Sequence, residues 1–320
     1  MFEGDDNIFP NKPEVVMKDN RSSWVKTILS MLLFVAVFVL LFSEDIALIL
    51  MITGILLLHE LGHFFMMKRF GYRSLNMLFI PIFGAMVSGD KVQVSQKQKF
   101  WISIMGPLPG ILLGMVGMIY CLEANELGLL FELSLLLLSI NLLNLFPIDP
   151  LDGGHIVEAL FFPSSPRFKL YFTLFSSLAL IALGFFLQIY IIMIFGFFMS
   201  LKVRGIQKNQ KIHENLDEIN VDYKKPYQEL SNREYWTIRR IFLENNPKIK
   251  EIIPDDLSLW ENEKLIVDQV RQLLKIEIIK DLKKFQQILL FLLFAAAIIV
   301  PSVLLYLNLD VIIETYWSVE

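Results

Sequence analysis

The 320-residue chain is far more apolar than a soluble domain: 55% of its residues are hydrophobic, only 19% are charged, and its mean hydropathy is +0.54. A net charge of −4, a pI of about 5.7 and the lack of a basic stripe in the sequence exclude nucleic acid as a partner. The single cysteine, Cys121, excludes an internal disulfide and a multi-cysteine metal site. We therefore predict an integral membrane protein.

Apolar runs long enough to cross a hydrocarbon core, which takes about 20 helical residues, follow one another along the chain. Residues 1–22 are polar and acidic, unlike the start of a signal peptide, so we expect a cytoplasmic tail followed by a retained first span. The first three predicted spans are Trp24–Phe42, Ile46–Met67 and Phe100–Cys121. Lysines and arginines precede the first span, follow the second and precede the third, which places the amino terminus in the cytoplasm.

The fourth apolar run starts near Leu127 and is interrupted. Residues 146–154 contain two prolines and two glycines, which do not continue an ordinary helix. Broken backbone at membrane depth is tolerated only where protein or a water-filled cavity surrounds it, so the interruption points to a functional site. Further on, residues 170–201 predict two short spans that turn near Gly184.

Residues 204–285 are polar and predict a small helical cytoplasmic domain, with helix-start patterns at Ser231 and Ser258. We expect its last helix, Trp260–Phe285, to run into a seventh span within residues 286–308.

The predicted fold is an all-α polytopic membrane protein with about seven spans. Residues 23–203 form its membrane core, with about six spans and a short hairpin near residues 75–94. No Lys or Arg follows Lys284, so the tail, residues 309–320, is predicted to lie outside. We expect the protein in the bacterial cytoplasmic membrane.

The second predicted span contains the motif Leu58-His-Glu-Leu-Gly-His63. On a helix His59 and His63 lie one turn apart, so both imidazoles can bind one metal ion, and Glu60 beside them can accept a proton from water. An ionisable residue in mid-membrane costs about 2.5–3.5 kcal/mol on insertion scales, so its presence requires a partner. The alternative is a polar helix face that packs against other helices or lines a water-filled channel.

A catalytic zinc ion needs a third protein ligand and an open fourth position. Four residues in or beside the interrupted run are candidates: Asp149, Asp152, His155 and Glu158. Considered alone, Asp152-Gly-Gly154 is equally compatible with a turn or a helix cap.

Together, the motif His59–His63 and the segment Asn144-Leu-Phe-Pro-Ile-Asp-Pro-Leu-Asp-Gly-Gly154 resemble the site-2 protease family of intramembrane metalloproteases. The resemblance implies Zn²⁺ as cofactor, Asp152 as its third ligand, and a role for Asn144 in binding substrate or stabilising the transition state. Gly106-Pro-Leu-Pro-Gly110 is similar to a glycine-proline motif of the same family, with an altered ending. No PDZ or CBS domain, which members often carry, is evident.

The stretch Leu75–Val94 is apolar, short and punctuated by Pro81 and Gly84, which favours two short strands over a spanning helix. The resemblance implies a re-entrant hairpin that offers a strand edge to substrate, and the residues predicted to contact it are Phe83, Gly84 and Ala85. Adding an extended peptide to a sheet edge is a general way to bind it. The alternative is a surface loop pressed on lipid.

These observations predict an intramembrane zinc metalloprotease whose partners are the lipid bilayer and a membrane-protein substrate, expected to be single-pass, that is cut within or near its span. Counting residues along the second span places the metal about 10–15 Å inside the cytoplasmic surface. Two alternatives remain: a catalytically idle relative that binds membrane clients, and a metal transporter. Two imidazoles and a carboxylate suit several divalent metals, and a homo-oligomer is left open.

Overall fold

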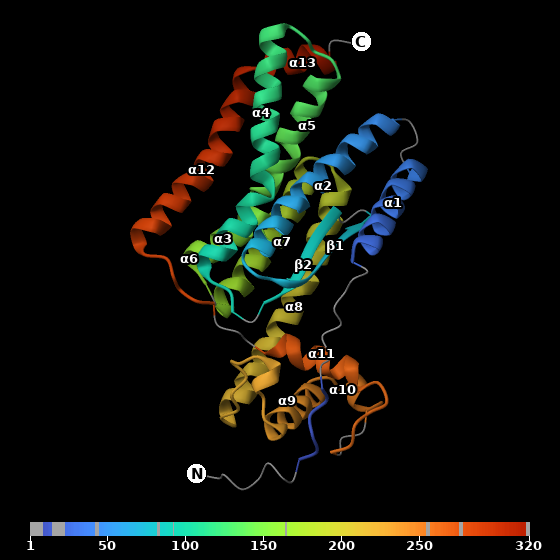
Figure 1. The fold of residues 1–320 in the computed structure, drawn as a ribbon, viewed down its shortest axis with the longest axis vertical. Coiled ribbons are helices and arrows are strands. Elements are labelled where there is room, and N and C mark those ends of the chain that lie inside the picture. The colour runs from blue at the N-terminus through green and yellow to red at the C-terminus, as the bar shows by residue number, and fades with distance from the viewer. Residues whose placement is uncertain are drawn as a thin grey trace. The chain divides into compact units, whose positions relative to one another are not determined.

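The computed structural model describes residues 9–14, 23–41, 45–81, 84–91, 93–163, 165–253, 257–274 and 278–317. In chain order (Figure 1) its elements are α1 (Ser23–Leu41), α2 (Ile46–Arg69), β1 (Arg73–Ile80), β2 (Gly84–Asp90), α3 (Gln96–Met105), α4 (Pro107–Ala124), α5 (Leu129–Asn144), α6 (Asp152–Phe161), α7 (Pro166–Phe186), α8 (Tyr190–Glu218), the 3₁₀ helix η2 (Tyr227–Glu229), α9 (Asn232–Glu244), α10 (Pro247–Lys250), α11 (Glu263–Leu273), α12 (Lys284–Leu307) and α13 (Leu309–Trp317).

The described residues form two compact units. One unit holds α1 to α6, the hairpin, α12 and α13, and we call it the membrane unit. The other holds residues 9–14 together with α7 to α11. The predicted membrane core, residues 23–203, includes α7 and the first half of α8, and in the structure both helices belong to the second unit.

Five helices in the described part of the chain are long and apolar enough to cross a membrane: Trp24–Leu41, Ile46–Arg69, Gln96–Ala124, Pro166–Phe186 and Lys284–Leu307. Leu129–Asn144 is a shorter apolar helix. The protein is therefore an integral membrane protein, as predicted, and the number of about seven spans stays a prediction.

The predicted hairpin is present as β1 and β2, which pair antiparallel with Met77 opposite Val87 and Phe79 opposite Ala85. In Figure 1 the two strands lie beside α1 and α2. Met77 and Phe79 are buried with Phe34 of α1 in a small apolar cluster, while Leu78, Ile80 and Met86 are exposed. This alternation follows from the period of two residues along a strand.

The interruption of the fourth run is shorter than predicted. The chain leaves α5 after Asn144 and resumes as α6 at Asp152, so Gly153 and Gly154 belong to the helix. A Cβ on Gly153 would lie 2.1 Å from the carbonyl oxygen of Leu145, and one on Gly154 would lie 2.6 Å from that of Ile148. The glycines therefore allow the interrupted backbone to pack directly on the first turn of α6.

Residues 170–201 form parts of two helices, α7 and α8, as predicted, but the turn lies at residues 187–189 instead of near Gly184. Gly184 is helical, and a Cβ there would lie 2.7 Å from the backbone nitrogen of Met193 in α8. It allows close contact between the two helices.

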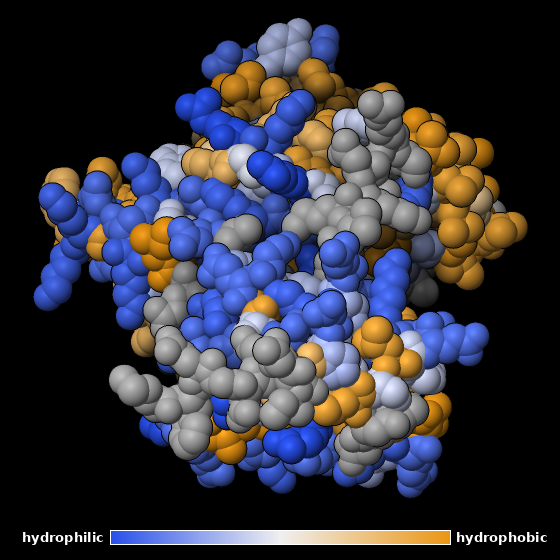
Figure 2. All heavy atoms as spheres, turned by 60° about the horizontal axis from the view of Figure 1, so that its bottom comes forward, coloured by the Kyte–Doolittle hydropathy of each residue, from blue (hydrophilic) through white to orange (hydrophobic). Residues whose placement is uncertain are grey.

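The helical domain packs around one apolar core to which η2, α9, α11 and the end of α8 contribute, including Leu216, Tyr235, Ile238 and Val270. Figure 2 looks at the helical domain from the side on which α9, α10 and α11 are seen in Figure 1, and the surface of these helices is mostly hydrophilic. A buried core beneath a polar surface is the pattern of a domain in water.

The prediction of one helix over Trp260–Phe285 is wrong. α11 ends at Leu273, and α12 begins only at Lys284. Between them Ile279 forms a parallel bridge with Ser95, and the backbone N–H of Gln96 donates to the carbonyl of Ile279 (3.0 Å). Backbone pairing with the start of α3 takes the place of helical hydrogen bonds here.

Candidate metal centre

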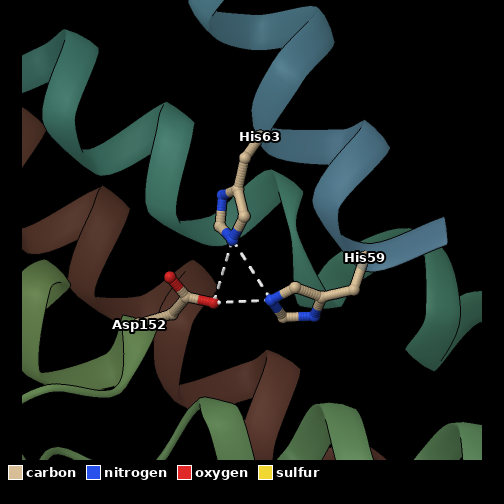
Figure 3. Close-up of side chains that lie close together, drawn as sticks. All are labelled: His59, His63 and Asp152. Carbon is tan, nitrogen blue, oxygen red and sulfur yellow. Dashed lines mark hydrogen bonds and ion pairs between the residues drawn. The ribbon is translucent and has the colours of Figure 1, made fainter. Parts of the chain in front are cut away.

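The two histidines of the motif lie where helical geometry predicts. His59 and His63 are one turn apart on α2, and their Nε2 atoms are 3.1 Å from each other. His59 is 4% exposed, and the side chain of His63 is 12% exposed. Both rings point toward the same small space (Figure 3).

A carboxylate from α6 completes the group. Oδ2 of Asp152 lies 3.0 Å from Nε2 of His59 and 3.3 Å from Nε2 of His63. Figure 3 shows the three side chains converging, the histidines from one helix and the aspartate from another. Among the described residues these three form the one group of histidines and carboxylates whose ligand atoms lie close enough to bind a metal ion.

The partners of the other ring nitrogens determine which nitrogen carries the proton. Nδ1 of His59 is 2.9 Å from Oδ1 of Asn141, and Nδ1 of His63 is 2.8 Å from the carbonyl oxygen of Ile102. Both partners are acceptors, so in the neutral imidazoles each Nδ1 carries the hydrogen and each Nε2 presents a lone pair. Nδ2 of Asn141 donates to the carbonyl of Leu137 (2.8 Å), which fixes the amide orientation.

Three lone-pair donors therefore converge on one point. Within the described residues, Oδ2 of Asp152 is a buried oxygen with no hydrogen-bond partner. A buried acceptor that faces two unprotonated nitrogens is unfavourable unless a cation or protons lie between them. The donor set thus fits a cation.

The spacing of the three atoms is compatible with zinc. Zinc binds histidine nitrogen and carboxylate oxygen at about 2.0–2.2 Å, and two ligands of a tetrahedral centre at that distance lie about 3.3–3.5 Å apart. The three separations of 3.0, 3.1 and 3.3 Å are close to this value. Metal-ligating histidines also commonly donate their second N–H to a carbonyl, as both do here.

Two glycines of the segment Gly106–Gly110 make room for this arrangement. A Cβ on Gly106 would lie 2.3 Å from Nε2 of His63 and 3.0 Å from that of His59. A Cβ on Gly110 would lie 2.2 Å from Nδ2 of Asn141. Any larger residue at either position would displace a side chain of the centre or its support.

Glu60 is buried, with 6% of its surface exposed, and lies next to His59 on α2. Its carboxyl group is close to the backbone of Val87 in β2. Glu60 is therefore adjacent to His59 in the chain and close to the hairpin in space.

The other predicted site residues are not members of this group of three. Asn144 donates from Nδ2 to the carbonyl of Ile140 in its own helix (3.0 Å). Of the alternative third ligands, Asp149 is buried outside the group, His155 is exposed, and Glu158 lies 3.6 Å from Nζ of Lys99.

Of the three residues predicted to contact substrate, Gly84 and Ala85 begin β2. Phe83 lies outside the described residues.

Asn141 was not among the residues predicted from the sequence. Its position one helical turn before Asn144 was the available signal, because residues three apart on a helix share a face. Which asparagine would reach His59 depends on the packing of α5 against α2 and α4, which the motif does not encode.

The fold and the centre define a class of protein. The helix α2, which is long and apolar enough to cross a membrane, carries two histidines and a neighbouring glutamate, and α6 adds an aspartate, in an arrangement that fits a metalloprotease. A family model described as peptidase family M50 matches residues 47–126, which include His59, Glu60 and His63 but not Asp152.

Two curated proteins are similar to this chain. A zinc metalloprotease from Methanocaldococcus jannaschii is 36% identical over 107 residues, which are 32% of this chain and 31% of that protein. Stage IV sporulation protein FB from Bacillus subtilis is 33% identical over 113 residues, 35% of this chain and 39% of that protein. A solved structure, the site-2 protease from Methanocaldococcus jannaschii, aligns with 55% of this chain and 87% of its own, at 25% identity and a TM-score of 0.42.

The match to peptidase family M50 and the similarity to a zinc metalloprotease support the predicted resemblance to the site-2 protease family. The chain spans between about three and four tenths of the length of the curated relatives it matches. What those whole proteins do is therefore a proposal for this chain.

Proposed function

We propose that this protein is an intramembrane zinc metalloprotease that cleaves a membrane-protein client within or near its transmembrane segment. The observation that carries the proposal is the convergence of Nε2 of His59, Nε2 of His63 and Oδ2 of Asp152 at zinc-ligand spacing beside a buried glutamate. When bound by these three atoms, zinc supplies a Lewis acid that activates water and polarises the scissile carbonyl.

The remaining roles fall to side chains of this chain. Glu60 accepts the proton of the attacking water and passes it to the leaving amine. Asn144, whose Nδ2 is partly buried and bonded to its own helix, is the proposed donor to the developing oxyanion and would exchange that bond for one to substrate. Asn141 does not touch the reacting atoms and positions His59.

The hairpin offers one edge to an extended substrate. On β1, the carbonyl of Met77 accepts from Oγ1 of Thr27 (2.7 Å), and the N–H of Phe79 donates to Oγ of Ser30 (3.1 Å). Both hydroxyls come from α1, so this helix covers the edge of β1 that faces away from β2.

By the alternation of an antiparallel pair, Ala85 and Val87, opposite Phe79 and Met77, present their backbone groups on the outer edge of β2. Val87 is the residue whose backbone is near Glu60. An added strand at β2 would therefore run beside the catalytic base, which supports the prediction for Gly84 and Ala85. We also propose that the hairpin is re-entrant, so that it enters the membrane and returns to the same side.

The proposed orientation has its amino terminus and helical domain in the cytoplasm. Residues 9–14 pack on the helical domain, so both lie on the same side of the membrane. Lys68 and Arg69 end α2, and basic residues favour the cytoplasmic side. His59 lies two to three turns before them, so water would reach the centre from the cytoplasm, and cleavage would release the cytoplasmic part of a client.

The test is co-expression with a panel of tagged single-pass proteins, comparing the native chain with Glu60→Gln and with Glu123→Gln, a carboxylate of α4 away from the centre. We expect a client that is cut by the native chain and by Glu123→Gln but accumulates uncut with Glu60→Gln, which keeps its metal. Equal cleavage by Glu60→Gln would overturn the mechanism.

The two alternatives give other results. An idle client-binding relative would retain clients without cutting any, and it has no use for a buried general base. A metal transporter would exchange its metal readily with both sides of a vesicle, whereas a catalytic centre keeps about one metal ion per chain through dialysis.

A further inference from the structure

The helical domain holds an extended segment of the same chain. We call residues Phe9–Pro13, with the sequence Phe-Pro-Asn-Lys-Pro, the strap. Nε1 of Trp236 donates to the carbonyl of Pro10 (2.8 Å), and the hydroxyl of Tyr227 donates to the carbonyl of Pro13 (2.9 Å). Phe9 packs against the apolar core of the domain.

The ammonium group of Lys12 makes several specific contacts. Its ammonium group donates to the carbonyls of Tyr227 (2.9 Å) and Gln228 (2.8 Å) and to that of Leu230, and it lies 5.3 Å from the centre of the Tyr227 ring. The three donors of the ammonium group thus have three acceptors. Burial lowers the pKa of Lys12, and the negative charge of Glu234 opposes that shift.

Asn232 recognises the backbone between the two prolines. Its Oδ1 accepts the N–H of Lys12 (2.9 Å), and its Nδ2 donates to Oδ1 of Asn11 (3.3 Å). The strap therefore has backbone and side-chain bonds at four consecutive positions, residues 10–13. Aromatic N–H and O–H groups that donate to the carbonyls of a proline-rich segment are a known mode of peptide recognition.

The surface beneath the strap is held rigidly. Trp236 packs on the guanidinium group of Arg239 at 5.0 Å, and Tyr227 packs edge-on against Tyr235. Arg239 and Tyr235 are in turn bound to the buried carboxylate of Glu263. Burial and Glu263 raise the pKa of Tyr227 to about 12, so its hydroxyl remains a donor at physiological pH.

We propose that this surface of the helical domain is a binding site for an extended, proline-flanked, lysine-containing peptide, and that the strap of the same chain is its resident ligand. Proline fixes φ and removes a donor, so such a segment loses little entropy on binding. Since the ligand is tethered, a free peptide has to compete against an effective concentration on the order of millimolar. The site is independent of the proposed proteolysis, and its test measures no cleavage.

The test uses the full chain in detergent with Cys121→Ser, Asn11→Cys and Asn232→Cys, because the side chains of residues 11 and 232 touch. A short bifunctional thiol reagent should join them within one chain. Two differently tagged copies are co-expressed to distinguish this product from one between chains. Products between chains, or none, would overturn the assignment of the strap as resident ligand.

The specificity of the site is measured by competition with a synthetic peptide of residues 9–14. The quantity measured is the peptide concentration that halves the yield of the crosslinked product. We expect Lys12→Met in the chain to lower this concentration about 10- to 100-fold, since it removes charge-assisted bonds. Lys224→Met, at an exposed lysine of the same domain, should leave it unchanged. A peptide with methionine in place of lysine should compete about 10- to 100-fold less well.

Tyr227→Phe is the second variant, because it removes only the hydroxyl and keeps the ring. It should weaken docking of the strap and of the peptide alike, by about 3- to 10-fold. Equal competition by the lysine and methionine peptides, or no change with Lys12→Met, would show that Lys12 is not recognised and would overturn the proposal.

Discussion

The candidate metal centre of the membrane unit and the ion pair of the helical domain both bury charged or strongly polar groups, but these groups differ in the partners they face. In the helical domain, Arg239 is 2% exposed and binds Glu263 through Nε (2.7 Å) and a second nitrogen (3.2 Å). The same carboxylate accepts the hydroxyl of Tyr235 (2.7 Å) and the N–H of Trp260 (3.1 Å). Donors there face acceptors.

In the metal centre three acceptors meet one another. Oδ2 of Asp152 faces Nε2 of His59 and Nε2 of His63, and the hydrogens of both rings are directed to carbonyl oxygens on the other side. The difference between the two regions distinguishes buried charges that stabilise the fold from buried charges that bind a ligand. A complementary network stabilises a fold, whereas a group that lacks its counter-charge indicates a ligand.

The largest expected effect is at Asp152. Asp152→Asn should abolish cleavage and weaken metal binding more than 100-fold, because loss of a ligand should exceed the roughly 10- to 100-fold caused by loss of a ligand's support. Asp149→Asn, at a buried aspartate of the same loop, should keep its metal within a few-fold. Metal content after competition with a chelator measures both, and equal losses would transfer the ligand role to Asp149.

The complementary network should behave in the opposite way. Arg239→Met leaves Glu263 buried and unpaired, so it should destabilise the protein by about 3–5 kcal/mol while leaving the metal content of the native fraction unchanged. Adding Glu263→Gln removes the unpaired charge but keeps acceptors for Tyr235 and Trp260, and should restore much of the loss. Thermal unfolding of the full chain measures this, and a double variant less stable than Arg239→Met would contradict it.

The two regions also differ in how far the sequence predicted them. Local helical spacing was sufficient to place His59, Glu60 and His63 together, because residues three or four apart share a helix face. Asp152 could not be chosen over Asp149, His155 and Glu158 from spacing alone. That choice came from the family resemblance, and the structure brings Asp152 to the histidines.

Contacts between distant segments were not predictable. Arg239 and Glu263 lie 24 residues apart, and Lys12 lies more than 200 residues from Tyr227, so their pairing depends on how helices pack. The wrong prediction of one helix over residues 260–285 has a related cause. The pattern of apolar and charged residues over this range does not reveal that the backbone of Ile279 pairs with Ser95 instead of continuing the predicted helix.

A smaller effect is expected one layer outside the ligands. Asn141→Ala removes the acceptor for Nδ1–H of His59 and should weaken metal binding about 10- to 100-fold, as loss of a histidine's second partner typically does. Asn144→Ala is the matched control on the same helix. It should lower cleavage without changing metal affinity, and a loss of metal with Asn144→Ala would assign both asparagines to positioning.

The smallest effect is expected from the loss of a buried hydroxyl in the membrane unit, and it depends on whether that hydroxyl bonds to another element or to its own helix. Thr27 donates to the carbonyl of Met77 in β1 (2.7 Å), whereas Thr53 donates to the carbonyl of Ile49 in its own helix (2.8 Å). Both residues are buried, at 4% and 6% exposure, and both can be replaced by valine with little change of shape. Only the first bond joins two elements, so only its loss should loosen one of them.

Thr27→Val should therefore cost about 0.6 kcal/mol and at most about 1.7 kcal/mol, the mean and the maximum measured for hydrogen bonds between membrane helices. Because α1 covers the outer edge of β1, the loss should appear as faster hydrogen exchange at Phe79, whose N–H donates to Ser30, and as a rise of about 3- to 10-fold in KM with kcat and metal content unchanged. Thr53→Val should change none of these quantities, since the carbonyl of Ile49 keeps its helical N–H partner. If both valine variants had the same effect, or if Thr27→Val lowered kcat alone, the hydroxyl would not act by holding the hairpin, and the edge offered to substrate would have to be set by β2 and Glu60 without help from α1.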